Sequence, residues 1–176
     1  NTSVGGRFVC SGAKVNVPPM VSADDLIGQA QSVIATAATP ADAIQLLSDW
    51  FDAPAGAGGF ADTAYRGSTD QVAEFGIDAS TTVRFGQTAN DPAARKILLG
   101  LTIGALVSKG AFDGDHAAQA EMMRAGGGAL IAGNSELALT RADLGMTEQV
   151  IERSSVRLDT MMTSFQIERT NMIQAD

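Results

Sequence analysis

Apolar residues recur at every seventh position through the last quarter of the chain, over residues 134–176. They form a single row: Leu137, Leu144, Ile151, Leu158, Phe165 and Met172. A row of this length, with no proline and with Gly145 as its one glycine after residue 134, predicts one long helix of the kind found in coiled coils. Such a helix needs a partner to cover the row, so we treat these six residues as a candidate assembly seam.

The positions three or four residues after each seam residue are mixed in character. They hold Thr140 and Arg141, Thr147 and Glu148, Ser154 and Ser155, and, as the only apolar pair, Met161 and Met162. Because a two-stranded coiled coil needs both of its core positions apolar, we expect no symmetric homodimer through the seam and favour a groove made by other helices. The alternative is one long helix that lies along its own domain.

Capping residues predict two helices near the start of the chain. Residues 22–38 begin with Ser22 and Asp25, whose side chains suit a capping box. Residues 39–52 begin with Thr39 as the cap residue and Pro40 at the first helical position.

Two further helices are expected before the seam. Asn90-Asp91-Pro92 precedes a run that is apolar nearly all round to about residue 107, which predicts a buried central helix. Another helix follows the turn at residues 113–115. Because glycine is a poor helix former, the three glycines at residues 126–128 predict either a break or a very close helix contact.

Between residues 60 and 87 the pattern changes to short runs divided by turn residues. The strand candidates are residues 63–66, 71–78 and 82–86, with a hairpin turn at Ala79 and Ser80. The predicted fold class is therefore α+β and mostly helical, with helices packed on a small antiparallel sheet. The glycine-rich residues 53–59 predict a linker, because they lack the Gly-Lys-Ser/Thr ending of a phosphate loop and no strand precedes them.

Charge and composition exclude several kinds of partner. The net charge is −8, from 12 Lys and Arg against 20 Asp and Glu, and this argues against nucleic acid or an anionic membrane surface. No apolar run approaches membrane-spanning length. Cys10 is the only cysteine, which excludes an internal disulfide and favours a small buried hydrophobic residue over a reactive thiol.

The chemistry of a catalytic or metal site is not found in the sequence. His116 is the only histidine, so neither a Ser/His/Asp triad nor a zinc site can be built plausibly. Asp113, Asp115 and Glu121 lie near it, but the spacing is too short for an EF-hand loop and suits the acidic N-terminus of a helix. We therefore predict that the chain is not an enzyme and that it holds no metal or cofactor.

Both ends of the chain resemble one protein family. Residues 1–12 contain Arg7-Phe8-Val9-Cys10-Ser11-Gly12, which is similar to the Gly-Arg-Tyr-Leu-Phe-Ser-Gly segment of the FlgL family, the flagellin-like hook-associated proteins of the hook-filament junction. Cys10 stands where that segment has its Phe. Residues 137–146 and 168–176 resemble the C-terminal helix that flagellins and these junction proteins share.

The resemblance implies a domain organisation. Residues 1–12 and 133–176 would form an incomplete helical rod like the inner domain of flagellin, and residues 13–132 a compact outer α+β domain. The chain starts without Met and ends within a periodic helix, so we expect a core fragment of a longer protein.

The resemblance also implies a function. Such proteins are structural adaptors that reach the outside of the cell through the flagellar type III pathway and assemble through their N- and C-terminal helices. Their partners would be other copies of the chain, the neighbouring hook-associated protein, flagellin and an export chaperone. One alternative is flagellin itself. Another, of a different class, is an extracellular module that binds a carbohydrate or small molecule in a pocket lined by Trp50-Phe51 and Phe60-Tyr65.

Overall fold

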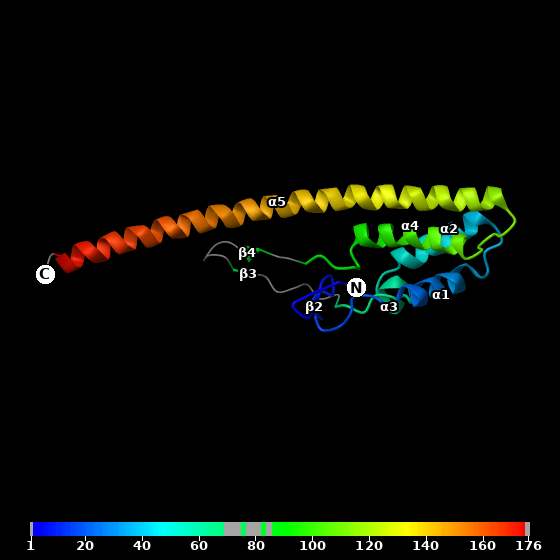
Figure 1. Ribbon diagram of the computed structural model, residues 1–176, viewed down its shortest axis with the longest axis horizontal. Coiled ribbons are helices and arrows are strands. Elements are labelled where there is room, and N and C mark those ends of the chain that lie inside the picture. The colour runs from blue at the N-terminus through cyan, green and yellow to red at the C-terminus, as the bar shows by residue number, and fades with distance from the viewer. Residues whose placement is uncertain (1, 69–74, 77–81, 84–85, 175–176) are drawn as a thin grey trace. The chain divides into compact units, whose positions relative to one another are not determined.

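A computed structural model of the chain describes residues 2–68, 75–76, 82–83 and 86–174. Figure 1 shows a mostly helical protein that ends in one very long helix. In chain order the elements are β1 (Ser3–Val4), β2 (Arg7–Phe8), α1 (Ala23–Ile34), α2 (Pro40–Asp52), α3 (Phe60–Thr63), β3 (Phe75–Gly76), β4 (Thr82–Val83), α4 (Pro92–Ser108) and α5 (His116–Gln174). The predicted mostly helical fold, with its long C-terminal helix and small antiparallel sheet, is confirmed at this level.

The chain divides into two compact units. The first contains Asn1–Val72 and Gly86–Ala138, and the second contains Ala73–Phe85 and Leu139–Asp176. The 59-residue helix α5 contributes to both. Residues 1–12 belong to the first unit. The predicted domains, residues 1–12 with 133–176 and residues 13–132, have other boundaries and stay a prediction.

Local capping explains where α1 and α2 begin. The Ser22 hydroxyl accepts a hydrogen bond from the Asp25 amide at 3.1 Å. Thr39 and Asp42 form a reciprocal capping box in which each side chain accepts from the other's amide at 3.1 Å, and Pro40 follows at the first helical position. Both helices therefore start where the sequence predicts, although α1 ends at Ile34 rather than at residue 38.

Helices form the core of the first unit. Helices α1, α2 and α4 pack against one another, and the start of α5 adds the fully buried Met122. Three aromatic rings from α2 and α3 pack together in this unit, with Trp50 edge-on to Phe51 and Phe60, and with Phe51 and Phe60 stacked at 5.0 Å. These contacts bury the apolar faces that the sequence pattern predicts for the helices.

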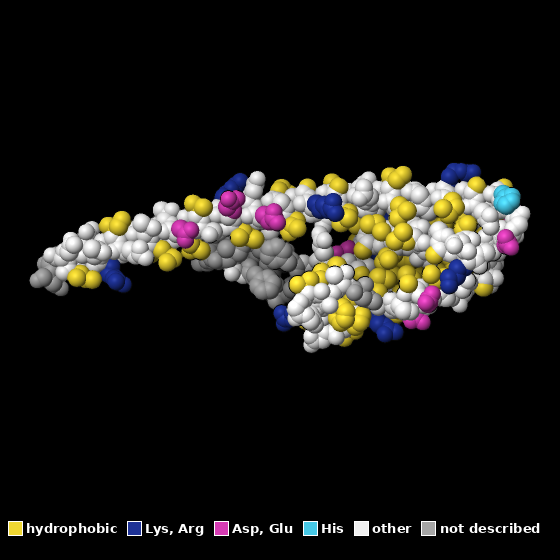
Figure 2. Space-filling model, viewed as in Figure 1, with side chains coloured by type: hydrophobic (Ala, Val, Ile, Leu, Met, Phe, Trp, Pro, Cys, Tyr) yellow, Lys and Arg dark blue, Asp and Glu magenta, His cyan; other side chains and the backbone are white. Residues whose placement is uncertain are grey.

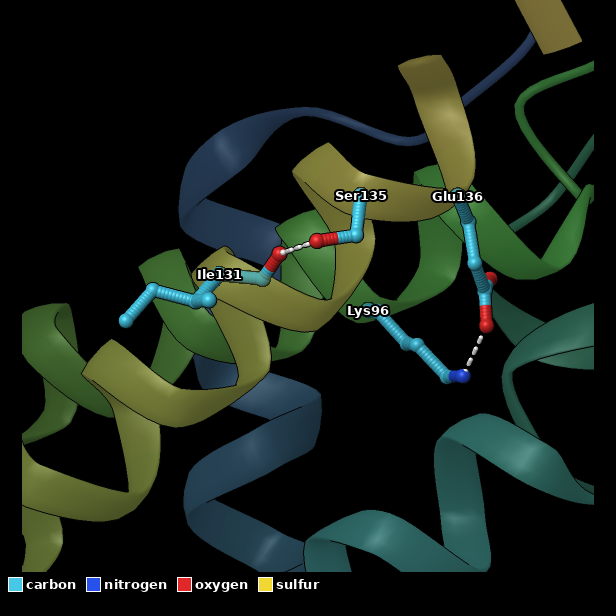
Figure 3. Close-up of polar contacts among 4 residues, drawn as sticks. All are labelled: Lys96, Ile131, Ser135 and Glu136. Atoms are coloured by element: carbon cyan, nitrogen blue, oxygen red, sulfur yellow. Dashed lines mark hydrogen bonds and ion pairs between the residues drawn. The ribbon is translucent and has the colours of Figure 1, made fainter. Parts of the chain in front are cut away.

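The glycines at residues 126–128 do not interrupt the helix. A Cβ at Gly100 of α4 would lie 2.6 Å from the carbonyl oxygen of Gly126, so the two backbones approach as closely as two glycines allow. The predicted break is wrong, and its alternative, a very close helix contact, is confirmed. About three turns further along α5 the Lys96 ammonium and the Glu136 carboxylate form an ion pair between the same two helices (Figure 3).

The strand predictions have mixed outcomes. β3 and β4 pair antiparallel, Phe75 opposite Val83, within two of the predicted runs, and the turn proposed at residues 79–80 lies outside the described residues. The run at 63–66 is not a strand, because α3 occupies Phe60–Thr63 and Tyr65 makes only an isolated bridge with Met20.

The N-terminal hairpin was not predicted. β1 and β2 pair antiparallel around Gly5 and Gly6, both of which have positive φ. Next to the hairpin, Cys10 is exposed and also has a positive φ of 67°, so the expectation of a buried cysteine is wrong. Its carbonyl oxygen accepts a hydrogen bond from the Ala89 amide at 3.0 Å, which ties this segment to the first unit.

Candidate assembly surface on the long helix

The six seam residues all lie on α5, where a step of seven residues returns to nearly the same side of the helix. Because each residue turns the helix by about 100°, the row drifts by about 20° per heptad and winds slowly around the axis. Leu137 and Ile151 are half-buried, whereas the other four are exposed, with Phe165 and Met172 each 68% exposed. The seam is thus a surface feature that becomes more exposed toward the C-terminal end.

Burial ends abruptly along the helix. Ser154, from the mixed row beside the seam, is only 3% exposed, and Thr147 and Ile151 just before it are half-buried. From Ser155 to the end of α5 at Gln174, every side chain is exposed. In the part of the chain that the structure describes, this stretch has no covering element on any side.

Apolar side chains of α5 from residue 139 onward lie on more than one side of the helix. Besides the seam, exposed apolar residues roughly opposite to it are Leu139, Met146, Val156 and Ile167, each about 160° around the axis from the seam residue two positions away. Val150 is also exposed and lies in a third direction, about 100° from Ile151. Figure 2 shows hydrophobic side chains along both edges of the helix. A helix that packs on one neighbour has a single apolar stripe, so this distribution suits a helix with several neighbours.

The sequence pattern did not predict these exposed apolar residues outside the seam. Their spacing of seven and then four residues, from Leu139 to Met146 to Val150, is itself helical, but a search for one seam does not detect a second. Within the described residues, Glu148, Glu152 and Arg153 form no ion pair with another part of the helix.

Of the acidic residues near His116, Asp115 caps the start of α5. Asp115 accepts hydrogen bonds from the amides of Ala117 and Ala118, both at 3.0 Å, and His116 is the exposed first residue of α5. Across the described ranges no three His, Cys, Asp or Glu side chains group as a metal site would require. The helices described also include none long and apolar enough to cross a membrane.

The aromatic residues proposed to line a pocket lie mainly in the core. Phe51, Phe60 and Tyr65 are at most 5% exposed. A cavity of about 260 Å³ lies beside Phe51 in the first unit, with Asp52, Arg95, Lys96, Leu99, Gly128, Ala129 and Ala132 around it. The two cationic side chains at this cavity, Arg95 and Lys96, both bind other groups of the protein.

Hydrogen bonds account for both cations at this cavity. The Arg95 guanidinium donates to the carbonyl oxygens of Phe51 and Asn90, and Lys96 binds Glu136 (Figure 3). The cationic groups therefore hold α4 against its neighbours and are not presented as a ligand site.

The glycine-rich residues 53–59 fold around a carboxylate of their own chain. Asp62 accepts hydrogen bonds from the amides of Gly56 and Gly58, the shortest at 2.8 Å each. These amide bonds hold the pKa of Asp62 below its usual value. The amides that a phosphate loop would offer to a ligand are thus already occupied.

Comparisons with known proteins add no relative to this picture. No protein-family model, no curated protein and no solved structure matches the chain.

Proposed function

We propose that this chain is a non-enzymatic structural component of the bacterial flagellum, an adaptor at the hook-filament junction that assembles through its helical ends. The observation that carries the proposal is the state of α5 between Ser155 and Gln174. This stretch is exposed on every side and carries apolar side chains in several directions, so it gains most of its possible burial only when other helices surround it.

The resemblance at both ends of the chain supplies the specific identity in this proposal. In it, residues 1–12 and 133–176 belong to a flagellin-like rod, and residues 13–132 form the outer domain. The partners are other copies of the chain, the neighbouring hook-associated protein, flagellin and, before export through the flagellar type III pathway, a chaperone. The assembled protein lies outside the cell.

Flagellin remains the alternative within the same class, because it shares the C-terminal helix on which the proposal depends. The binding-module alternative has less support. Its aromatic cluster is largely core, and the cations at the neighbouring cavity are engaged by protein groups.

Immunogold labelling of the bacterium that encodes the chain would test the proposal. Antibodies against residues 13–132 should label a single short zone at the base of each filament. Labelling along the whole filament would instead identify a flagellin, and labelling away from the flagellum would contradict both. Deletion of the gene should leave hooks without filaments, and complementation with the intact gene is the control.

A further inference from the structure

Charged residues in the middle of α5 fall on two separate sides of the helix. The first flank carries Arg141, Glu148, Glu152 and Asp159, and the second flank carries Asp143, Arg153 and Arg157. At about 100° per residue, the centres of the two flanks are roughly 150° apart around the helix axis. All seven side chains are exposed and belong to the second compact unit.

These charges are arranged so that they cannot pair within their own helix. None of the seven has a residue of opposite charge three or four positions away. The two pairs at that spacing, Glu148 with Glu152 and Arg153 with Arg157, carry like charges, which disfavours the isolated helix. In the described chain none of the seven forms an ion pair, and Arg153 donates only to the Gln149 side chain, at 3.4 Å.

At three levels along the helix axis the two flanks carry opposite charges. Arg141 on the first flank matches Asp143 on the second, Glu152 matches Arg153, and Asp159 matches Arg157. The members of each match differ by one or two residues, which is about 1.5 to 3 Å of axial rise. Glu148 on the first flank and Glu168, which continues the second flank, have no charged counterpart.

We propose that a second copy of this chain docks here, with the first flank of one α5 against the second flank of the next and both helices pointing the same way. The inference rests on the proposed assembly role and names both the partner and the recognition element. Leu139, Met146 and Val150 lie on the side of the second flank and add exposed apolar surface to the contact. Opposite charges at matching heights fix the register of the two helices.

This contact joins two different surfaces of the chain. Flanks that are roughly 150° apart cannot both face the same neighbouring helix, so a two-fold symmetric pair cannot use them together. Each copy therefore leaves one flank free for a further copy, and the association continues into a ring or an open array. The seam faces another direction and remains available to other helices.

Site-directed cross-linking can test this arrangement. Two single-thiol chains are prepared with Cys10→Ser, one carrying Gln166→Cys on the first flank and the other carrying Ser164→Cys on the second flank. Both positions are exposed and neither removes a charge. After the two chains are mixed in equal amounts with a short thiol cross-linker, the ratio of mixed to like-with-like dimers should be about fivefold above the 1:1 ratio of random pairing. A random distribution, or an excess of like-with-like dimers, would overturn the proposal.

Charge reversal gives a second, independent readout of the same contact. Glu152→Arg with Asp159→Arg should return the mixed dimers to their random share, and so should Arg153→Glu with Arg157→Glu. All four reversals in one chain restore complementarity and the original net charge, so the excess should return. Failure to return would contradict the pairing. Reversal of the exposed Asp24 and Asp49 on other helices is the matched control for net charge.

The outcomes separate this inference from the proposed function. Labelling at the filament base together with random cross-linking would retain the flagellar role and reject the charged contact. A charge-dependent excess of mixed dimers in a protein that does not label the flagellum would retain the contact and reject the role.

Discussion

Individual glycines have opposite effects in the contact between α4 and α5. At Gly100 an added Cβ would meet the carbonyl oxygen of Gly126 at 2.6 Å, whereas at Gly128 it would meet nothing within 4 Å. We expect Gly100→Ala to lower the free energy of unfolding by about 1–3 kcal/mol, because backbone cannot move aside as a flexible side chain can. The control Gly128→Ala should raise it by up to about 1 kcal/mol through helix propensity. Urea denaturation of both variants checks this, and equal effects would contradict the close contact.

Asp62 predicts a pH dependence of stability at the same scale. Its pKa is lowered below 3.8 by hydrogen bonds from the Gly56 and Gly58 amides, so the folded chain binds fewer protons there than the unfolded chain. The stabilisation is therefore complete above pH 3.8 and is lost as the pH falls through the folded-state pKa. Asp62→Asn should lower the urea midpoint at neutral pH and flatten its decline in acid. The exposed Asp24→Asn should do neither, and a parallel acid decline in Asp62→Asn would refute the assignment.

At the scale of elements, α5 has a part that packs in the core of the first unit and a part that is exposed. Phe165 is 68% exposed and Met122 is fully buried, although both lie on α5. Phe165→Ser should change the free energy of unfolding by less than about 0.5 kcal/mol, since it leaves no cavity. Met122→Ala should cost about 2–5 kcal/mol because it does. Thermal and urea unfolding measure both.

The same two substitutions should have the opposite ranking in their effect on assembly. In the complete protein Phe165→Ser should weaken assembly with partner helices, measured by sedimentation, while any Met122→Ala that remains folded should assemble normally. A large loss of stability from Phe165→Ser alone would mean that the seam is already covered within one chain.

Elements that depend on local chemistry were predictable from the sequence. Thr39, Pro40 and Asp42 specify the start of α2 by themselves, so the capping pattern was sufficient. The continuity of α5 was not predictable from propensity, because the glycines at 126–128 are compensated by close packing of Gly126 on α4. Likewise, the run at residues 63–66 was predicted as a strand, but Thr63 ends α3, where the burial of Phe60 in the core outweighs local preference.

The candidate surface was predictable only in part for a related reason. Periodicity identified the seam residues on one helix, since period is a property of the sequence alone. It did not reveal where burial stops, which depends on what packs on each side. Ser154 is polar and buried, while Phe165 is apolar and exposed, so residue type by itself would have assigned each to the wrong environment.

At the scale of the whole molecule, α5 passes from a packed unit into one with little cover, and its local stability should follow. Residues 118–130 lie beside the core formed with α4, whereas residues 155–174 are exposed throughout. Helices of this length gain most of their stability in proteins from packing on one face. Amide hydrogen exchange should therefore be at least about 100-fold slower in residues 118–130 than in 155–174, which open locally.

Assembly should reduce this difference if the exposed stretch is an interface. Helices that surround residues 155–174 exclude water from the seam and stabilise the closed helix, so protection there should rise toward that of residues 118–130. The experiment compares exchange in the chain alone with exchange in the assembled complete protein. Phe165→Ser serves as the control in which the rise should be reduced. Uniform protection along α5 in the isolated chain, or no gain on assembly, would show that this part of the helix is stable without partners and is not the surface that they bind.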